Sequence, residues 1–301
     1  MRAATSEAGE VRCVVDARDQ LGETPLWCPR SERIWWIDIE RPKLQSFDER
    51  TGEHRVHLFP DSTFLGGLAL HREGGFVVAL DNTLHRFDPA SGRLDRIVEV
   101  EPPDRGTRLN DGRCDRQGRL WIGTMDAAIE KPLGSFYRVD PSGTATWQFD
   151  DIIVTNSVAT SPDGRTLYMS DTRRFKIWAF DLDADDGVLS NRRVFADYTN
   201  GTGRPDGACV DSDGCLWNAV FAGGRVVRYT PAGTLDRVIE MPVTHPTCVC
   251  FGGADLGTLY ISSATKMLSP EVLANEPLAG ALLAVEVGVK GLPEAMFGAV
   301  V

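Results

Sequence analysis

Short runs of apolar and aromatic residues recur along the chain, and each run follows a polar turn. Six segments share this pattern: "CPRSERIWWIDI" from Cys28, "HREGGFVVAL" from His71, "DRQGRLWIGTM" from Asp115, "SPDGRTLYMSD" from Ser161, "DSDGCLWNAVF" from Asp211 and "GGADLGTLYISSA" from Gly252. Runs rich in β-branched and aromatic residues predict β-strands, and the Gly, Pro, Asp and Ser between them predict turns. A unit that recurs about every 40 to 50 residues indicates a repeat architecture.

Each of these strands has neighbours of the same kind. An apolar run precedes it, as in "GGLAL", "SVAT" and "GACV", and a third run closed by a turn follows most of them, as in "TLHRFDPASG" and "SFYRVDPSG". Units of four short strands are typical of propeller blades. The pattern therefore predicts an all-β fold, a six-bladed β-propeller. We expect a single domain over residues 11–301, after a flexible N-terminal tail of residues 1–10.

The two ends of the chain supply additional strands. A lone strand, "EVRCVVDA", begins the chain, and "GALLAVEV" and "EAMFGAV" follow the last repeat. We expect the two ends to pair in one sheet, which closes the ring and removes two strand edges. The one helix signal is "SPEVLANEP", in which Ser269 can cap, Pro270 suits the first turn and Glu271 faces the positive helix end. This short helix is predicted to lie over one mouth of the propeller.

Polar residues recur at one position of the repeat. In a propeller the innermost strands start at the same mouth, so equivalent residues converge on the central channel. Counting back eight residues from the turn glycine reaches Asn110, Asn156 and Asp206 in the third, fourth and fifth repeats. The same count reaches Gly66 in the second repeat, and Glu23 falls within one residue of the equivalent place in the first. Four blades therefore present oxygen-bearing side chains at one level of the channel.

A carboxylate at the start of a buried strand needs a partner. Buried charges are tolerated only when they are paired or bind a metal. No Lys or His recurs at this level, which favours a metal as the counter-charge. Asp and Asn also occur in turns because their side chains bond to nearby backbone, and we interpret Asp115, Asp163, Asp211 and Asp213 in that way. On the residues alone, the ring of four indicates either metal or substrate binding.

Charge narrows the class of partner. The 301 residues carry 43 acidic and 32 basic side chains, a formal charge of -11, and contain no Lys/Arg run. A nucleic-acid backbone or an anionic membrane would be repelled, so neither is expected as a partner. The chain shows neither a signal peptide nor an apolar stretch of about 18 residues, so we expect a cytoplasmic protein without a membrane span.

Several other functional signals are absent or weak. The seven cysteines include no C-x-x-C pair, and we interpret Cys248 and Cys250, which have strand spacing, as small buried apolar residues. No G-x-S-x-G, H-E-x-x-H or Walker motif occurs, which argues against nucleophilic elbows, zincin sites and phosphate-binding loops. "DLDADDG" resembles the start of an EF-hand loop, but Arg192 stands where a Glu is required, so a hairpin loop is predicted. His245, in "THPT", is a candidate for the channel mouth.

Four segments together resemble a known family. "LGETPLW", "RLNDGRCDRQGRLWIGTM", the segment from Asn156 to "SPDG", and "RPDGACVDSDGCLW" followed by "CFGG" are similar to motifs of the senescence marker protein (regucalcin)/gluconolactonase family. They occur in the right order over nearly the whole chain. The resemblance is strongest to bacterial lactonases that open the aldonolactones of pentoses or hexoses.

The resemblance implies roles for single residues. Glu23, Asn156 and Asp206 would hold one divalent cation, and Arg108 and Asn110 would contact the substrate. Animal members carry an acidic pair soon after G-T-M, whereas this chain has only Asp126 followed by two alanines. Asp126 and Glu130 are therefore candidates for substrate contact, and the sugar preference of the family does not transfer.

These residues predict a specific chemistry. Two carboxylates and one amide oxygen suit calcium, magnesium or manganese, and zinc or ferrous iron are possible. The expected function is metal-dependent hydrolysis of a sugar lactone, such as glucono-, xylono- or arabinono-lactone, to the aldonic acid. Asp206 would act as general base toward the attacking water. Two alternatives remain: a broader esterase or organophosphate hydrolase, and a non-catalytic propeller that binds calcium or a protein.

Overall fold

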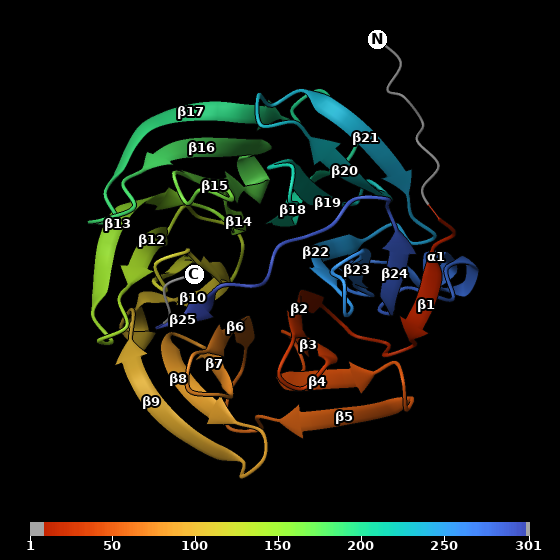
Figure 1. The fold of residues 1–301 in the computed structure, drawn as a ribbon, viewed down its shortest axis with the longest axis horizontal. Helices are drawn as coiled ribbons and strands as arrows, with labels where there is room; N and C mark the ends of the chain where they lie inside the picture. Colours follow the sequence, from red (N-terminus) through yellow and green to blue (C-terminus); the bar gives the residue numbers. More distant parts are fainter. Residues whose placement is uncertain (1–8, 299–301) are drawn as a thin grey trace.

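The computed structural model describes residues 9–298, and they form six four-stranded units around a central channel (Figure 1). This confirms the predicted six-bladed β-propeller. The predicted tail, residues 1–10, lies almost entirely outside the described residues. Blades 1 to 3 contain β2 (Gly22–Cys28), β3 (Arg33–Asp38), β4 (Lys43–Asp48) and β5 (Glu53–Leu58); β6 (Leu65–His71), β7 (Phe76–Leu80), β8 (Thr83–Asp88) and β9 (Arg93–Glu99); and β10 (Thr107–Cys114), β11 (Leu120–Asp126), β12 (Gly134–Val139) and β13 (Ala145–Ile152).

Blades 4 to 6 complete the ring. They contain β14 (Thr155–Thr160), β15 (Thr166–Asp171), β16 (Lys176–Leu182) and β17 (Leu189–Asp197); β18 (Arg204–Val210), β19 (Leu216–Phe221), β20 (Arg225–Tyr229) and β21 (Leu235–Glu240); and β22 (Pro246–Gly252), β23 (Thr258–Ser263), β24 (Leu282–Glu286) and β1 (Arg12–Val15). Every residue of β10, β14 and β22 is buried, whereas β5 is exposed along most of its length. The inner strand of a blade is therefore covered on both faces, whereas the outer strand faces solvent.

The turn aspartates anchor the core as well as the turns. Asp115 accepts hydrogen bonds from the backbone N–H groups of Gln117 and Arg119, both at 3.0 Å, and its other oxygen accepts one from Trp121 Nε1 at 2.8 Å. Trp121 is fully buried.

The other turn aspartates can be compared with Asp115. In blade 5, Asp211 and Trp217 repeat this arrangement, and Asp163 also bonds to its own turn. Asp213 differs from the prediction, because its carboxylate pairs with Arg228 at 2.8 Å.

The predicted closure of the ring is partly confirmed. The N-terminal strand β1 pairs antiparallel with β24 and forms the outer edge of blade 6. The sequence predicts that the second C-terminal strand also joins this sheet. It crosses the molecule instead. Its residues Met296–Phe297 form β25, which pairs in parallel with the end of β6 in blade 2. The inner edge of a blade exposes unpaired backbone groups to the channel, and β25 satisfies some of them.

The segment that leads to β25 closes one end of the channel. We call residues 289–298 the C-terminal strap. Its backbone bonds to the turns of several blades: Gly291 N–H donates to Leu256 O at 2.8 Å, and Gly298 N–H donates to Gly118 O at 2.9 Å. Inside the channel, Glu294 accepts two hydrogen bonds from Arg113 Nη1, at 2.8 and 2.9 Å. The strap therefore ties blades 2, 3, 5 and 6 together across the end that is opposite the starts of the inner strands.

We expect Glu294→Gln to destabilise the protein by about 3–5 kcal/mol, because it leaves the Arg113 guanidinium buried without a counter-charge. The two side chains are 10% and 17% exposed, so solvent screens the pair little. Urea unfolding followed by tryptophan fluorescence measures the change. The exposed Glu240→Gln on β21 is the matched control, and an equal effect of both substitutions would contradict the role of the pair.

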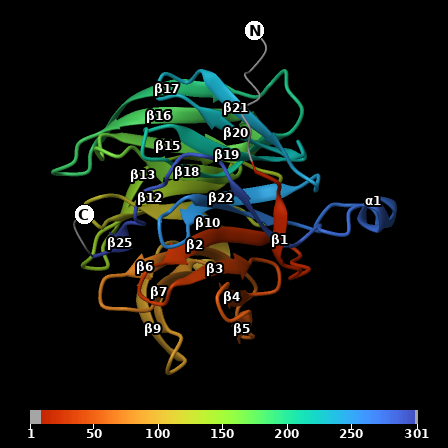
Figure 2. The ribbon, with the colours of Figure 1, turned by 45° about the vertical axis from the view of Figure 1, so that its right-hand side comes forward.

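The predicted helix is present, but its position differs from the prediction. Helix α1 (Pro270–Asn275) starts at Ser269, whose Oγ accepts a hydrogen bond from Val272 N–H at 3.3 Å. It buries none of its residues and projects from the side of the ring (Figure 2). With only six residues and none of them buried, the helix does not pack over the channel. The loop before it, with Lys266 and Met267, reaches the mouth instead.

The cysteines and the acidic loop "DLDADDG" have largely the environments that the sequence predicts. All seven cysteines are free; Cys13 is exposed and the other six are buried, as predicted for Cys248 and Cys250. "DLDADDG" forms the hairpin loop between β16 and β17, with Gly187 N–H donating to Asp183 O at 2.9 Å. No helix in residues 9–298 has the length and apolar character that a membrane span requires.

Candidate active site

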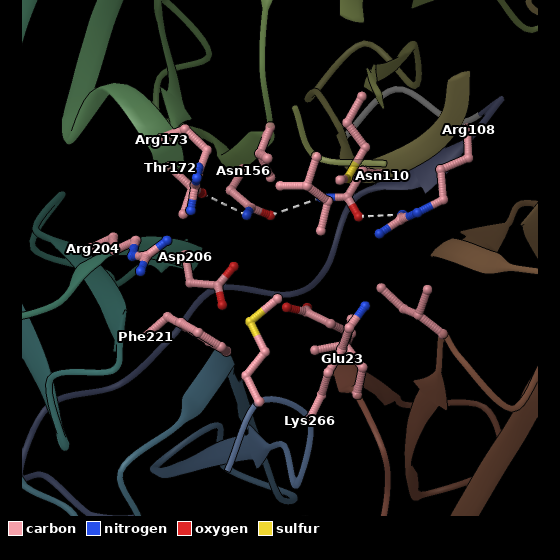
Figure 3. A pocket seen from close by; sticks show the side chains of 16 residues that line it. Glu23, Arg108, Asn110, Asn156, Thr172, Arg173, Arg204, Asp206, Phe221 and Lys266 are labelled. Atoms are coloured by element: carbon pink, nitrogen blue, oxygen red, sulfur yellow. Dashed lines mark hydrogen bonds between the residues drawn. The ribbon is translucent and has the colours of Figure 1, made fainter. Parts of the chain in front are cut away.

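A pocket opens where the inner strands begin, at the end of the channel opposite the C-terminal strap (Figure 3). It contains about 620 Å³ of space not filled by atoms, part of which is open to solvent. Five of the predicted site residues line it: Glu23, Arg108, Asn110, Asn156 and Asp206. They come from blades 1, 3, 4 and 5, so positions far apart in the sequence meet because the repeat places them at one level.

Irregular backbone aims these side chains into the pocket. The register between each inner strand and its neighbour shifts just after the site residue, as it does after Glu23 on β2 and after Asn156 on β14. Such bulges are common next to active sites, where they redirect a side chain. Thr24 and Ser157, which follow these two residues, have φ angles of 46° and 57°. Non-glycine residues adopt this left-handed region at a cost, which is typical of functional sites.

Blade 2 provides no ligand at this level, as the sequence predicts. At Gly66 an added Cβ would lie 2.0 Å from Leu109 O, so no side chain fits there. Its neighbour Phe64 instead carries the Arg108 guanidinium over its ring, at 5.0 Å from the ring centre. This contact holds Arg108 at the edge of the pocket by a cation–π interaction.

A chain of hydrogen bonds orients the amides of the site. Arg108 Nη1 donates to Asn110 Oδ1 at 2.6 Å, and Asn110 Nδ2 donates to Asn156 Oδ1 at 3.2 Å. Asn156 Nδ2 in turn donates to Thr172 Oγ1 at 2.8 Å, and that hydroxyl donates to Pro205 O at 2.8 Å. With both amide nitrogens engaged, the Asn156 oxygen retains one lone pair for a ligand in the pocket.

The two carboxylates of the site are buried, and neither forms an ion pair within residues 9–298; the charge of Arg108 acts on Glu23 and that of Arg204 on Asp206, but burial has the larger effect on both. Glu23 and Asp206 are 5% and 6% exposed. Burial raises the pKa of Glu23 to about 8, and the nearby Asp111 carboxylate adds to this increase. Burial also raises the pKa of Asp206 well above its ordinary value, with Glu23 and Asp111 contributing. Both carboxylates ionise together near neutral pH only if a cation joins them.

The donors fit a hard divalent cation. Within residues 9–298 no group of three or more His, Cys, Asp or Glu side chains could hold a metal. The carboxylates of Glu23 and Asp206 and the amide of Asn156 do line one pocket, and metal binding by these three residues stays a prediction. Oxygen donors of this kind suit calcium, magnesium or manganese, with water or substrate in the remaining positions.

The sequence reasoning missed Asp111. Its Oδ2 accepts a hydrogen bond from Val158 N–H at 2.9 Å, and burial raises its pKa to about 6. Through its charge it affects both Glu23 and Asp206, although it does not line the pocket. A count that selects one residue per repeat takes Asn110 and passes over its neighbour, so the motif "RLND" was the only available signal.

Two predicted substrate contacts lie outside the pocket. Glu130 is exposed, and Asp126 is buried with its carboxylate accepting hydrogen bonds from Ala128, Glu130 and Lys131 N–H at 3.1, 2.9 and 2.8 Å. Asp126 ends the second strand of its blade, where Asp171 stands in blade 4 and also receives backbone N–H groups. We therefore propose a structural role for Asp126: it shapes the loop that brings Ile129 to the pocket.

His245 supports the pocket from behind. Its ring stacks on Phe221, with centroids 4.1 Å apart, and its Nδ1 lies 3.0 Å from Lys266 O. Phe221 and Lys266 both line the pocket, whereas His245 does not. The histidine thus lies next to the mouth and holds two lining residues in place.

Two lining arginines were not predicted. Arg204 is the first residue of β18, and Arg173 lies in the short 3₁₀ helix η2 (Thr172–Arg174). Arg204 stands two residues before Asp206, and alternate strand residues share a face, so spacing offered a signal for it. Arg173 had none, because its position depends on η2, where Arg173 N–H donates to Asp171 Oδ1 at 3.1 Å.

The chain is similar to known lactonases and to one protein family over most of its length. The profile described as the SMP-30/Gluconolactonase/LRE-like region matches residues 21–265. The chain is 39% identical to a 6-deoxy-6-sulfogluconolactonase of Pseudomonas putida, over 95% of this chain and 98% of that protein. It is 37% identical to an L-arabinolactonase of Azospirillum brasilense, over 96% of each chain.

A solved structure shows the same fold. A calcium-binding protein, regucalcin, of Agrobacterium tumefaciens superposes with a TM-score of 0.91 at 34% identity, over 97% of this chain and 98% of that one. The sequence and structure matches extend over the whole propeller and include the strands that form the pocket. They confirm the resemblance read from the motifs, and the chain belongs to the SMP-30/gluconolactonase/LRE-like family.

Proposed function

We propose that this protein hydrolyses sugar lactones to aldonic acids with the help of one divalent cation. The observation that carries the proposal is the pair of buried carboxylates, Glu23 and Asp206, which face one pocket beside the oriented amide of Asn156. Relatives that match nearly the whole chain are named as lactonases. The pocket also contains hydrogen-bond donors suited to sugar hydroxyls, which a purely structural channel would not need.

Three pocket residues, Asp206, Arg108 and Asn110, have roles in this reaction. A bound divalent cation supplies Lewis-acid polarisation of the lactone carbonyl. Asp206 takes a proton from the attacking water, whose oxygen forms the new bond to the carbonyl carbon. The bond from that carbon to the ring oxygen then breaks, and the ring oxygen leaves as a hydroxyl after it receives the proton from Asp206. Arg108 and Asn110 orient the sugar hydroxyls and stabilise the negative charge that develops on the carbonyl oxygen.

A pH-stat screen tests the proposal. Glucono-, xylono- and arabinono-lactones are supplied to protein treated with chelator, and Ca²⁺, Mg²⁺, Mn²⁺, Zn²⁺ or Fe²⁺ is then added singly. We expect acid release at the spontaneous rate with chelator and at least about a 100-fold increase with one or more of the ions, since a metal contributes several kcal/mol to such a transition state. Metal-independent turnover, or none above the spontaneous rate, would contradict the proposal.

The same screen separates the alternatives. A phosphotriester hydrolysed faster than any lactone would favour the broader esterase or organophosphate hydrolase. Tight calcium binding without turnover of any ester would favour the non-catalytic propeller. The regucalcin neighbour, named as a calcium-binding protein, makes calcium the first ion to test.

A further inference from the structure

The pocket mouth has an excess of positive charge. Four cationic side chains line it, Arg108, Arg173, Arg204 and Lys266, against the two carboxylates Glu23 and Asp206. The chain as a whole carries a formal charge of -11. A cation bound by the two carboxylates would neutralise them and leave the arginines in excess. A protein so acidic has concentrated positive charge at the one place where its substrate would enter.

Two of these arginines form no ion pair within residues 9–298, although the Asp206 carboxylate lies near enough to Arg204 to act on its pKa. Lys266 pairs with Glu40, and Arg108 donates to Asn110 and to its own strand. Among the residues that the structure describes, the side chains of Arg173 and Arg204 form no ion pair and donate no hydrogen bond. Arg204 is half-buried, and its guanidinium lies 5.9 Å from the ring centre of Phe175.

The neighbouring arginine shows that acidic partners are available in this region. Arg174, adjacent to Arg173 on the same short helix, pairs with Asp151 at 2.9 Å and with Asp171 at 3.6 Å. Arg173 points into the pocket instead (Figure 3). Arg204 is half-buried, and the carboxylate nearest to it, Asp206, would be neutralised by a bound cation, which leaves this guanidinium available for an anionic group of a ligand.

The position of the two arginines indicates which part of the ligand they meet. In Figure 3, Arg173 and Arg204 lie on the same side of the pocket as Asp206, and Arg108 lies on the opposite side of Asn156 and Asn110. A lactone whose carbonyl lies at the Glu23–Asp206 pair can therefore extend toward either side. Arg108 already has a neutral hydrogen-bonding environment that suits hydroxyl groups. Arg173 and Arg204 together present two forks of donors without an acceptor, a geometry that matches an anion with two or three equivalent oxygens.

We propose that the preferred substrates are sugar lactones with an anionic group, a sulfonate, phosphate or carboxylate, on the carbon farthest from the carbonyl, and that Arg173 and Arg204 bind this group. The inference rests on the proposed lactonase function. The three groups share the feature that these arginines recognise, namely negative charge spread over two or three oxygens. In the -11 protein this local positive charge also draws an anionic substrate toward the mouth.

The test compares anionic with neutral lactones of the same ring. The metal-loaded protein is assayed with glucono-1,5-lactone and with its 6-phospho, 6-deoxy-6-sulfo and 6-carboxylate counterparts, and spontaneous hydrolysis is subtracted. We expect kcat/KM to be higher for at least one anionic lactone than for the neutral one, and the KM of that lactone to rise with added NaCl. The identity of the best substrate distinguishes sulfonate, phosphate and carboxylate.

The variants Arg204→Gln and Arg173→Gln locate the effect. Each is expected to lower kcat/KM for the anionic lactone by about 10- to 100-fold, the loss of a charged hydrogen bond, and to affect the neutral lactone far less. Arg173 is exposed, so its variant keeps the test valid if Arg204→Gln fails to fold. Arg165→Gln, at an exposed turn after Gly164, changes the net charge equally and should leave both activities unchanged.

Four results would overturn the inference. Equal losses on neutral and anionic lactones would show that the arginines act on the carbonyl end or on the product carboxylate. No loss with either variant, or a preference for the neutral lactone, would remove the anionic substrate class while lactone hydrolysis stands. Failure to hydrolyse any lactone with any ion would instead overturn the proposed function, and this inference with it.

Discussion

Replacing Asp206 with asparagine is expected to lower kcat/KM for a sugar lactone by about 10²- to 10⁴-fold, the range typical for loss of a general base. The substitution keeps the size of the side chain and its oxygen, but removes the charge that would attract a cation and the site that would accept a proton. Initial rates in a pH-stat at saturating metal measure the loss. Binding of the metal should weaken in the same variant, as followed by titration calorimetry.

Asp206→Asn is expected to stabilise the metal-free protein, although it lowers the activity. In metal-free protein near pH 8, Asp206→Asn should raise the unfolding temperature, because Asp206 is buried beside Glu23 and Asp111 without a cation. The control is Asp163→Asn, which removes one carboxylate from an exposed turn where it bonds to Ser161 and Arg165. Similar activity in the two variants would contradict the proposed role of Asp206.

Metal affinity is expected to increase steeply with pH, by at least about 50-fold between pH 6 and pH 8. The pKa of Glu23 is raised to about 8, so metal-free protein retains that proton at neutral pH, and the cation must displace it. Displacing one proton costs about tenfold in apparent affinity for each pH unit below the pKa. Calorimetric titrations with the activating ion at pH 6 and pH 8, in buffers of different ionisation enthalpy, give both the affinity and the number of protons released.

The raised pKa of Glu23 also determines whether the stability of the metal-free protein rises or falls with pH. Because Glu23 ionises near pH 4.5 when unfolded and near 8 when folded, metal-free protein should lose stability as pH rises through this interval. Saturating metal should remove this loss, since it binds the ionised form of the folded protein. The stability of the metal-free Glu23→Gln variant should not change with pH over the same interval, apart from the contributions of Asp206 and Asp111. An affinity that does not change with pH would contradict the account of this site.

The repeat made much of the fold and part of the site predictable. Asn110, Asn156 and Asp206 were found by their distance from a turn glycine, because the inner strands of blades 3, 4 and 5 have the same spacing to that glycine and each contains a register shift beside the site residue. Departures from the repeat could not be found in this way. Phe221 ends the second strand of blade 5, where Asp171 ends that of blade 4, and it lines the pocket although the repeat would place an anchoring carboxylate there.

Two further features depend on contacts that no periodicity encodes. The partner of β25 could not be read from "EAMFGAV", because a short apolar strand fits any unpaired edge and only the path of the chain across the channel selects β6. Asp126 looked like a substrate ligand by its place after "GTM", whereas three backbone N–H groups of its own loop occupy its carboxylate. Local hydrogen bonding therefore decided the environment of that residue.

The C-terminal strap determines how molecules can exchange at the site. Glu294 bonds to Arg113 inside the channel and Phe297 is buried beside β6, so the strap crosses the end of the channel opposite the pocket. We expect substrate to enter and product to leave through the pocket mouth, because the strap obstructs passage along the channel. Aldonic acid that accumulates should therefore compete with fresh lactone for the same entrance.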